Sequence, residues 1–215
     1  MKRRKDKKHI VETPKEHGLT DAKYLCVLVD ISNYTNVISP LSFQGSIKVQ
    51  KYHSIFINTM EAIARNFGGV SSKYGGGDKV VSFFPKKSKP SSDKTPFKDV
   101  LRCGLAMQAA HDDMNKKYYE EDLPPMNYRI SADCGKIERQ VAATCFNIYK
   151  KAPPNGMVIG ENLYDMINNS FESDYHFTKI YEYHSDKNEH SQDPYPIYLI
   201  SRNDDNVLAM QPSRL

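Results

Sequence analysis

Residues 73–84 read KYGGGDKVVSFF, a pattern that predicts a tight turn followed by a β-strand. Three consecutive glycines allow a sharp reversal of the backbone, and the run that follows has the β-branched and aromatic residues typical of a strand. Together with residues 69–72, GVSS, the stretch predicts a β-hairpin with Asp78 at its tip. A carboxylate held on a rigid turn is a suitable metal ligand.

A second carboxylate, Asp30, directly follows the apolar run YLCVLV at residues 24–29. A nearly continuous apolar run predicts a strand buried on both faces in the middle of a sheet. Our central hypothesis is that Asp30 and Asp78 converge on one metal pair. The ordinary alternatives are a strand-end turn or N-cap residue for Asp30 and a simple hairpin residue for Asp78.

The pattern of the remaining residues predicts an α+β sandwich, in which a mixed sheet carries helices on its outside. Apolar spacing predicts helices at residues 46–67, 97–118, 144–151 and 161–168. Alternating or continuous apolar runs predict further strands at residues 127–133, from 136, and at 157–160, 175–183 and 195–200. We expect one domain over residues 23–200, with a flexible loop at 86–96 and disordered tails at 1–22 and 201–215.

Composition fits a soluble globular protein, with 215 residues, 39% apolar content and a mean hydropathy of -0.63. No apolar run approaches the roughly 20 residues that span a bilayer, and the N-terminus lacks the apolar centre of a signal peptide, so we expect a cytoplasmic protein. The four cysteines have no C-x-x-C spacing and are expected to be reduced. The basic N-terminal residues lack interleaved aromatics, which favours a solvated tail over a nucleic-acid-binding arm.

Four segments resemble motifs of the class III nucleotidyl cyclase catalytic domains, the adenylate and guanylate cyclases. DISNYT at residues 30–35 is similar to the family's D-I-x-x-[FY]-T, and Gly77-Asp78 falls where the family has its second metal aspartate. NYRISADCG at 127–135 resembles the family strand that ends in glycine, and APPNGMVIG at 152–160 resembles its A-x-x-G-x-[IV]-x-[IV]-[SG] segment. The resemblance covers residues 24–199 and implies a ferredoxin-like sandwich with a mainly antiparallel mixed sheet.

The same resemblance implies conversion of a nucleoside triphosphate, with ATP favoured, to the 3′,5′-cyclic monophosphate and pyrophosphate in cyclic-nucleotide signalling. Asp30, Asp78 and the backbone carbonyl of Ile31 would hold two Mg²⁺ or Mn²⁺ ions. Two such ions about 3.5–4 Å apart would activate the 3′-hydroxyl and neutralise the leaving pyrophosphate. Oxygen ligands suit Mg²⁺ or Mn²⁺ better than zinc.

Contacts to the nucleotide are expected from two places. Backbone amides at the start of the helix or turn after Ile31 would bind the triphosphate, which gives as candidates Ser32, Asn33, Tyr34 and Thr35. Lys73 corresponds to the family's base-reading lysine, but it precedes Asp78 by one residue more than the K-x-x-G-D pattern. It reaches the pocket only if the glycine run forms a bulge, and the alternative is a solvated hairpin lysine.

The second half of the family's site is altered here. In the family, a dimer partner supplies an asparagine and an arginine from a D-x-x-G-x-x-V-N-x-x-[AS]-[RK] segment. Residues 136–147, KIERQVAATCFN, are shorter and place Ala143 and Asn147 at those two positions. Alanine donates no hydrogen bond, and asparagine carries no charge for the transition state. Candidate replacement cations are Arg139 and Lys150, and Lys179 is a candidate for a triphosphate contact.

Three functional interpretations remain open. In the first interpretation, the chain is an active cyclase with a low rate that acts as a homodimer or heterodimer. Alternatively, it is a catalytically impaired homologue that supplies the metal half-site to a partner chain or acts as a nucleotide-binding regulator. The third is a relative of polymerase palms or diguanylate cyclases, which is disfavoured because Lys79 stands where those enzymes place a second acid.

Overall fold

The computed structural model describes residues 22, 24–74, 77–85, 95–171, 175–183 and 195–202. The predicted tails at 1–22 and 201–215 and the predicted loop at 86–96 fall almost entirely outside these residues, as do Gly75 and Gly76. None of the helices in the described ranges is both long and apolar enough to cross a membrane.

The described ranges form one seven-stranded sheet with the order β2-β3-β1-β4-β5-β7-β6. The β4–β5 pair is parallel and the other neighbouring pairs are antiparallel, as predicted for a mixed, mainly antiparallel sheet. β1 lies inside the sheet between β3 and β4, which the apolar run predicts. The strands are β1 Tyr24–Ile31, β2 Val70–Tyr74, β3 Lys79–Pro85, β4 Tyr128–Gly135, β5 Met157–Gly160, β6 Tyr175–Tyr183 and β7 Tyr195–Arg202.

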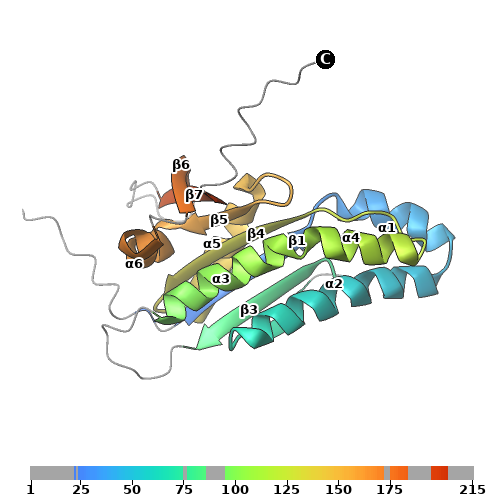
Figure 1. Cartoon of the computed structure of the whole chain (residues 1–215), viewed down its shortest axis with the longest axis horizontal. Coiled ribbons are helices and arrows are strands. Elements are labelled where there is room, and N and C mark those ends of the chain that lie inside the picture. The colour runs from blue at the N-terminus through green and yellow to red at the C-terminus, as the bar shows by residue number, and fades with distance from the viewer. Residues whose placement is uncertain are drawn as a thin grey trace, which may run out of the picture.

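Helices cover both faces of this sheet, and α2, α3 and α4 lie across one face in Figure 1. The predicted helix 97–118 is divided into α3 and α4 at Ala110. The helical segments are α1 Tyr34–Phe43, α2 Ser46–Asn66, α3 Thr95–Ala109, α4 His111–Glu120, α5 Glu138–Ile148, the 3₁₀ turn η2 Tyr149–Lys151 and α6 Glu161–Phe171.

Two predictions for residues 136–151 are wrong. No strand begins at Lys136, and the helix begins at Glu138 rather than near Thr144. β4 already pairs with β1 on one side and β5 on the other, so a strand that follows it directly cannot pair with β4. Val141, Cys145 and Ile148 are buried at helical spacing, and this periodicity was the signal for α5.

The side chains of β1 point alternately to the two faces of the sheet. Leu25, Val27 and Val29 belong to the large core packed by α2, α3, α4 and α6. Cys26 and Leu28 belong to a smaller cluster on the opposite face, where α5 and η2 contribute Val141, Cys145 and Tyr149. Because side chains alternate with period two, Asp30 lies on the face of α5 and η2.

A buried carboxylate joins three elements near the middle of the sheet. Asp133 on β4 accepts a hydrogen bond from the Tyr195 hydroxyl of β7 (2.5 Å) and another from the Leu163 amide of α6 (3.2 Å). Gly160 leaves room for it, because a Cβ there would lie 2.6 Å from Asp133 Cγ. Burial raises the pKa of Asp133 to about 7, although the Tyr195 hydrogen bond opposes the shift.

Asp133→Asn should remove a pH dependence from the stability of the fold. A carboxyl whose pKa is raised in the folded state favours folding when protonated, so its contribution falls as pH rises from about 4 to about 7. We expect the free energy of unfolding, wild type minus variant, to decrease over this window in urea titrations. Asp113→Asn on the exposed surface of α4 is the matched control. A wild-type-minus-variant difference that stays constant with pH would contradict the assignment.

Candidate functional site

Asp30 and Asp78 lie side by side because β1 and β3 pair antiparallel. In that register Asp30 is opposite Lys79, the first residue of β3. The Ile31 amide also donates a hydrogen bond to the Asp78 carbonyl (2.9 Å), which holds the turn residue beside the end of β1. The structure thus brings together the two carboxylates that the sequence hypothesis pairs.

The Lys79 ammonium lies between the two carboxylates. Its Nζ is 2.7 Å from Asp30 Oδ1 and also forms an ion pair with Asp78 Oδ2. The side chains of Asp30, Asp78 and Lys79 are 11%, 14% and 21% exposed, so this cluster is shielded from most of the solvent. One cation of the chain itself therefore faces both candidate metal ligands.

The electrostatics of the cluster follow from burial and from these contacts. Burial raises the pKa of Asp30, and the nearby Asp78 charge adds to this, while Lys79 and Arg129 oppose it. Burial alone would lower the pKa of Lys79, but the contacts with Asp30 and Asp78 outweigh it, so its pKa is raised. Lys79 is therefore protonated at neutral pH.

The carboxylates have donor chemistry that fits a hard divalent cation. Asp78 Oδ1 is buried and accepts no hydrogen bond from any residue in the described ranges, whereas Asp30 Oδ1 has the Lys79 ammonium 2.7 Å away. Over the same ranges, no cluster of three or more His, Cys, Asp or Glu side chains could hold a metal. Further ligands would have to come from backbone carbonyls, water or a bound phosphate, as is usual for Mg²⁺.

Arg129 and Tyr149 approach the same cluster from β4 and η2. Arg129 is opposite Asp30 in the β1–β4 register, and its buried Nε has no hydrogen-bond partner among the described residues. Burial raises the pKa of the Tyr149 phenol, and the charge of Asp30 adds to that shift. The cluster thus combines two carboxylates with two cations and a phenol on one face of the sheet.

His53 on α2 lies against the turn that carries Asp78. A Cβ on Gly77 would lie 3.3 Å from His53 Nδ1, so the imidazole packs directly on this glycine. A hydrogen bond of 2.8 Å joins His53 Nε2 and the Tyr34 hydroxyl, and the two rings are stacked. Burial lowers the pKa of His53, while the charge of Asp78 opposes the shift.

The residues predicted to contact the triphosphate begin at the end of β1, and they differ in which backbone and side-chain groups are available for binding. The Ser32 amide donates to the Asn127 carbonyl (2.7 Å), whereas the Ser32 hydroxyl is buried and has no partner within the described part of the chain. Asn33 has a left-handed backbone conformation (φ 55°) and is the N-cap of α1. Tyr34 and Thr35 form the first turn of α1, where backbone amides generally lack helical partners.

Lys73 lies on β2 opposite Val80, and the β2–β3 register continues without a shift to Tyr74 opposite Lys79. The side chain of Lys73 lies outside the described residues, as does the glycine bulge on which its contact with a base depends. Its role as a base-reading residue therefore stays a prediction.

The positions of the family's asparagine and arginine both fall on α5. Ala143 and Asn147 are exposed, whereas Val141, Cys145 and Ile148 on the same helix are buried. Among the candidate replacement cations, Arg139 is exposed in the first turn of α5, and Lys150 Nζ lies 6.0 Å from the centroid of the Tyr149 ring. Lys179 is on β6, which three strands separate from β1, so this chain does not bring it to Asp30.

Sequence reasoning did not assign Lys79, Arg129 and Tyr149, which the structure adds to the cluster, or His53, which packs against the turn that carries Asp78. The sequence feature that could have indicated Lys79 is its position directly after Asp78 at the start of a predicted strand. Arg129 enters through the β1–β4 register, which a single sequence does not reveal.

Solved structures supply the comparison with known proteins, because no protein-family model and no curated protein matches the chain. The adenylyl cyclase CyaB from P. aeruginosa is 16% identical, with a TM-score of 0.68 over 85% of this chain and 96% of that one. The guanylyl cyclase Cya2 is 17% identical, with a TM-score of 0.66 over 84% and 92%. The guanylate cyclase domain of RhGC from Catenaria anguillulae, in complex with GTP, is 12% identical, with a TM-score of 0.64 over 85% and 97%. The chain has the fold of these cyclase domains, as the sequence resemblance predicts.

Proximity of His53 to Asp78 can be tested by NMR titration of the imidazole. We expect His53 to titrate below its ordinary value of 6.5, because burial disfavours the imidazolium. Asp78→Asn removes a nearby negative charge that favours the imidazolium, so the pKa of His53 should fall further. Asp113→Asn, which makes the same chemical change on α4, should leave it unchanged. A His53 pKa that does not respond to Asp78→Asn would refute this placement.

Proposed function

We propose that the chain is a nucleotidyl cyclase-type enzyme domain that binds a nucleoside triphosphate, with ATP favoured, and releases the 3′,5′-cyclic monophosphate and pyrophosphate in cyclic-nucleotide signalling. The observation that carries the proposal is the convergence of Asp30 and Asp78 at the ends of paired strands. The fold shared with adenylyl and guanylyl cyclase domains supports it, and one of the similar domains was solved with GTP.

In the proposed reaction the 3′-hydroxyl oxygen attacks the α-phosphorus, and the bond from this phosphorus to the bridging oxygen of the β-phosphate breaks. The hydroxyl proton passes to solvent water, and pyrophosphate leaves with the bonding electrons. Asp30, Asp78 and the Ile31 carbonyl would hold two Mg²⁺ or Mn²⁺ ions, which would lower the pKa of the hydroxyl and neutralise charge on the leaving group.

Residues of the chain itself offer positive charge to the triphosphate. The planar guanidinium of Arg129 suits bidentate contact with phosphate oxygens, and its Nε is unpaired within the described ranges beside Asp30. The first turn of α1, at Tyr34 and Thr35, adds backbone amides and the positive end of a helix dipole. Both groups border the carboxylate pair, which supports a triphosphate position over the ends of β1 and β3.

The proposed active unit is a dimer of two copies or of this chain with another cyclase-type chain. Ala143 has no side-chain hydrogen-bond donor and Asn147 has no charge, whereas the transition state requires both. A cation must therefore come from elsewhere. Ile137, the N-cap of α5, is 50% exposed, and Val70 on the edge strand β2 is 67% exposed, so both apolar side chains are available for burial by a partner.

One observation favours a second candidate function, that of a nucleotide-binding regulator or metal half-site without its own turnover. Lys79 already pairs with both carboxylates, and this contact opposes metal binding. Under this alternative the chain binds a nucleoside triphosphate in the presence of metal but forms no cyclic product by itself.

The test is incubation of the purified chain with ATP, GTP, CTP or UTP in Mn²⁺, with mass spectrometry for the cyclic product. We expect cyclic product, formed most readily from ATP, and a loss of at least about 100-fold in rate for Asp78→Asn, because this substitution removes a proposed metal ligand. The matched control Asp113→Asn should retain the wild-type rate.

Metal-dependent triphosphate binding without product would favour the regulator. Absence of both binding and product would contradict the proposed function.

A further inference from the structure

The position between Asp30 and Asp78 is filled by a side chain of the protein. The register pairs Lys79 directly with Asp30, and the neighbouring Asp78 is the preceding residue in the chain. Nζ is 2.7 Å from Asp30 Oδ1 and is paired with Asp78 Oδ2, so one ammonium contacts both carboxylates at once. A divalent ion that bridges the same two side chains needs the same space.

The balance of charge favours the ammonium in the unliganded site. Two partly buried carboxylates without a cation would repel each other in a poorly solvated environment. Lys79 relieves this repulsion without any solute from solution, and its attachment to β3 gives it an effective concentration on the order of millimolar or higher. A free Mg²⁺ or Mn²⁺ ion must displace the ammonium and also lose part of its hydration shell.

A divalent ion alone would also leave the displaced ammonium beside a doubly charged cation. The Lys79 side chain is 21% exposed and has a flexible stem, so it is able to turn away from the carboxylates. A bound triphosphate provides anionic oxygens with which the displaced ammonium can pair. Metal and nucleotide therefore help each other to bind, in the sense of reciprocal linkage.

We propose that Lys79 is a built-in counter-cation that excludes free divalent metal from Asp30 and Asp78. Removal of its charge opens the pair to metal in the absence of nucleotide. In the unsubstituted chain, metal enters together with a triphosphate. This joint entry of metal and triphosphate rests on the proposed function.

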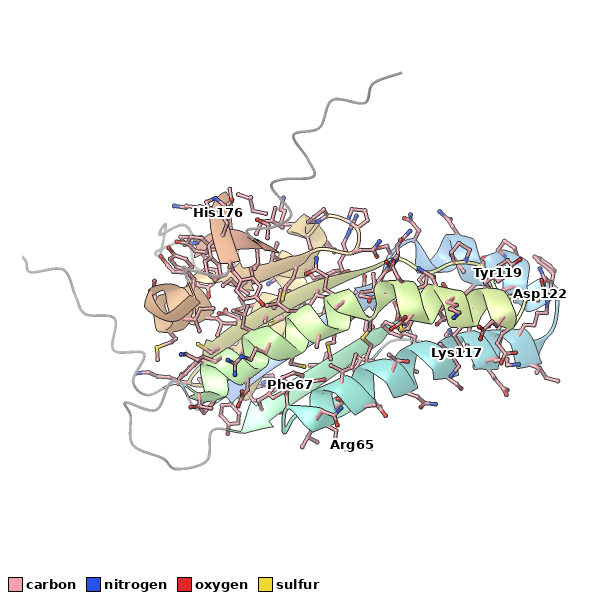
Figure 2. The ribbon with its side chains drawn as sticks, in the orientation of Figure 1. Arg65, Phe67, Lys117, Tyr119, Asp122 and His176 are labelled. Carbon is pink, nitrogen blue, oxygen red and sulfur yellow. The ribbon has the colours of Figure 1, made fainter. Side chains whose placement is uncertain are left out.

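The experiment measures Mn²⁺ binding directly, from the loss of the electron paramagnetic resonance signal of the free ion. Lys79→Met keeps an unbranched side chain but removes the charge, and without nucleotide it should bind Mn²⁺ at least about tenfold more tightly than wild type. Adding Asp78→Asn to Lys79→Met should abolish the gain. The matched control is Lys117→Met on α4, whose labelled side chain in Figure 2 is exposed and belongs to a helix on the other face of the sheet.

Equal Mn²⁺ affinity for wild type and Lys79→Met would overturn the proposal. The unsubstituted chain gives an independent test in case the variant does not fold. If wild type binds Mn²⁺ tightly without nucleotide and Asp78→Asn abolishes that binding, the ammonium is no barrier and the proposal is wrong. Lys79→Gln provides a second neutral variant, for which the same gain is expected.

A third arm separates this inference from the proposed function. Because an ATP analogue itself chelates Mn²⁺ and removes the free-ion signal, this arm measures protein-bound Mn²⁺ by equilibrium dialysis. A non-cyclisable ATP analogue present on both sides of the membrane should increase Mn²⁺ binding by wild type. If the analogue has no effect although Lys79→Met gains affinity without it, the lysine proposal stands and the triphosphate site is wrong. If the analogue increases Mn²⁺ binding but Lys79→Met gains nothing, the triphosphate site stands and the exclusion by Lys79 is wrong.

Discussion

The antiparallel pairing of β1 with β3 is the constraint on which the candidate site depends. It sets Asp30 opposite Lys79, and the Ile31 amide hydrogen bond to Asp78 continues the pairing into the turn. A shift of one residue would turn these side chains to the other face of the sheet, because side chains alternate along a strand. Burial of Leu25, Val27 and Val29 in the large core fixes the register against such a shift.

The two faces of the sheet have different tasks. One face packs against α2, α3, α4 and α6 and supplies most of the buried apolar surface. The other face carries the charged cluster at one end and is packed by α5 and η2. Asp30 on β1 lies between Lys79 on β3 and Arg129 on β4, because both are its partners in the strand register. The sheet itself therefore assembles these charges. The large core can therefore stabilise the fold while the charged face remains free to bind a ligand.

Local sequence patterns predicted the parts of the fold that local residues determine. The apolar run before Asp30 predicted an interior strand, and the apolar spacing after Gly45 predicted α2. Residues 136–151 were mispredicted because the available sheet edges depend on strand pairing elsewhere. The approach of Asp30 to Asp78 was predicted from two motifs, whereas the contacts of Lys79 and Arg129 required the register of three strands.

We infer that the sheet builds one cation position from Asp30 and Asp78, and that Lys79 occupies it until a ligand displaces the ammonium. The sharpest test is a crystal structure of the unsubstituted chain grown with Mn²⁺ and without nucleotide, in which the anomalous signal locates manganese. We expect Lys79 Nζ in contact with both carboxylates and no manganese peak between them. A manganese peak bridging Asp30 and Asp78, with Lys79 turned toward solvent, would show that the ammonium does not hold this position against metal.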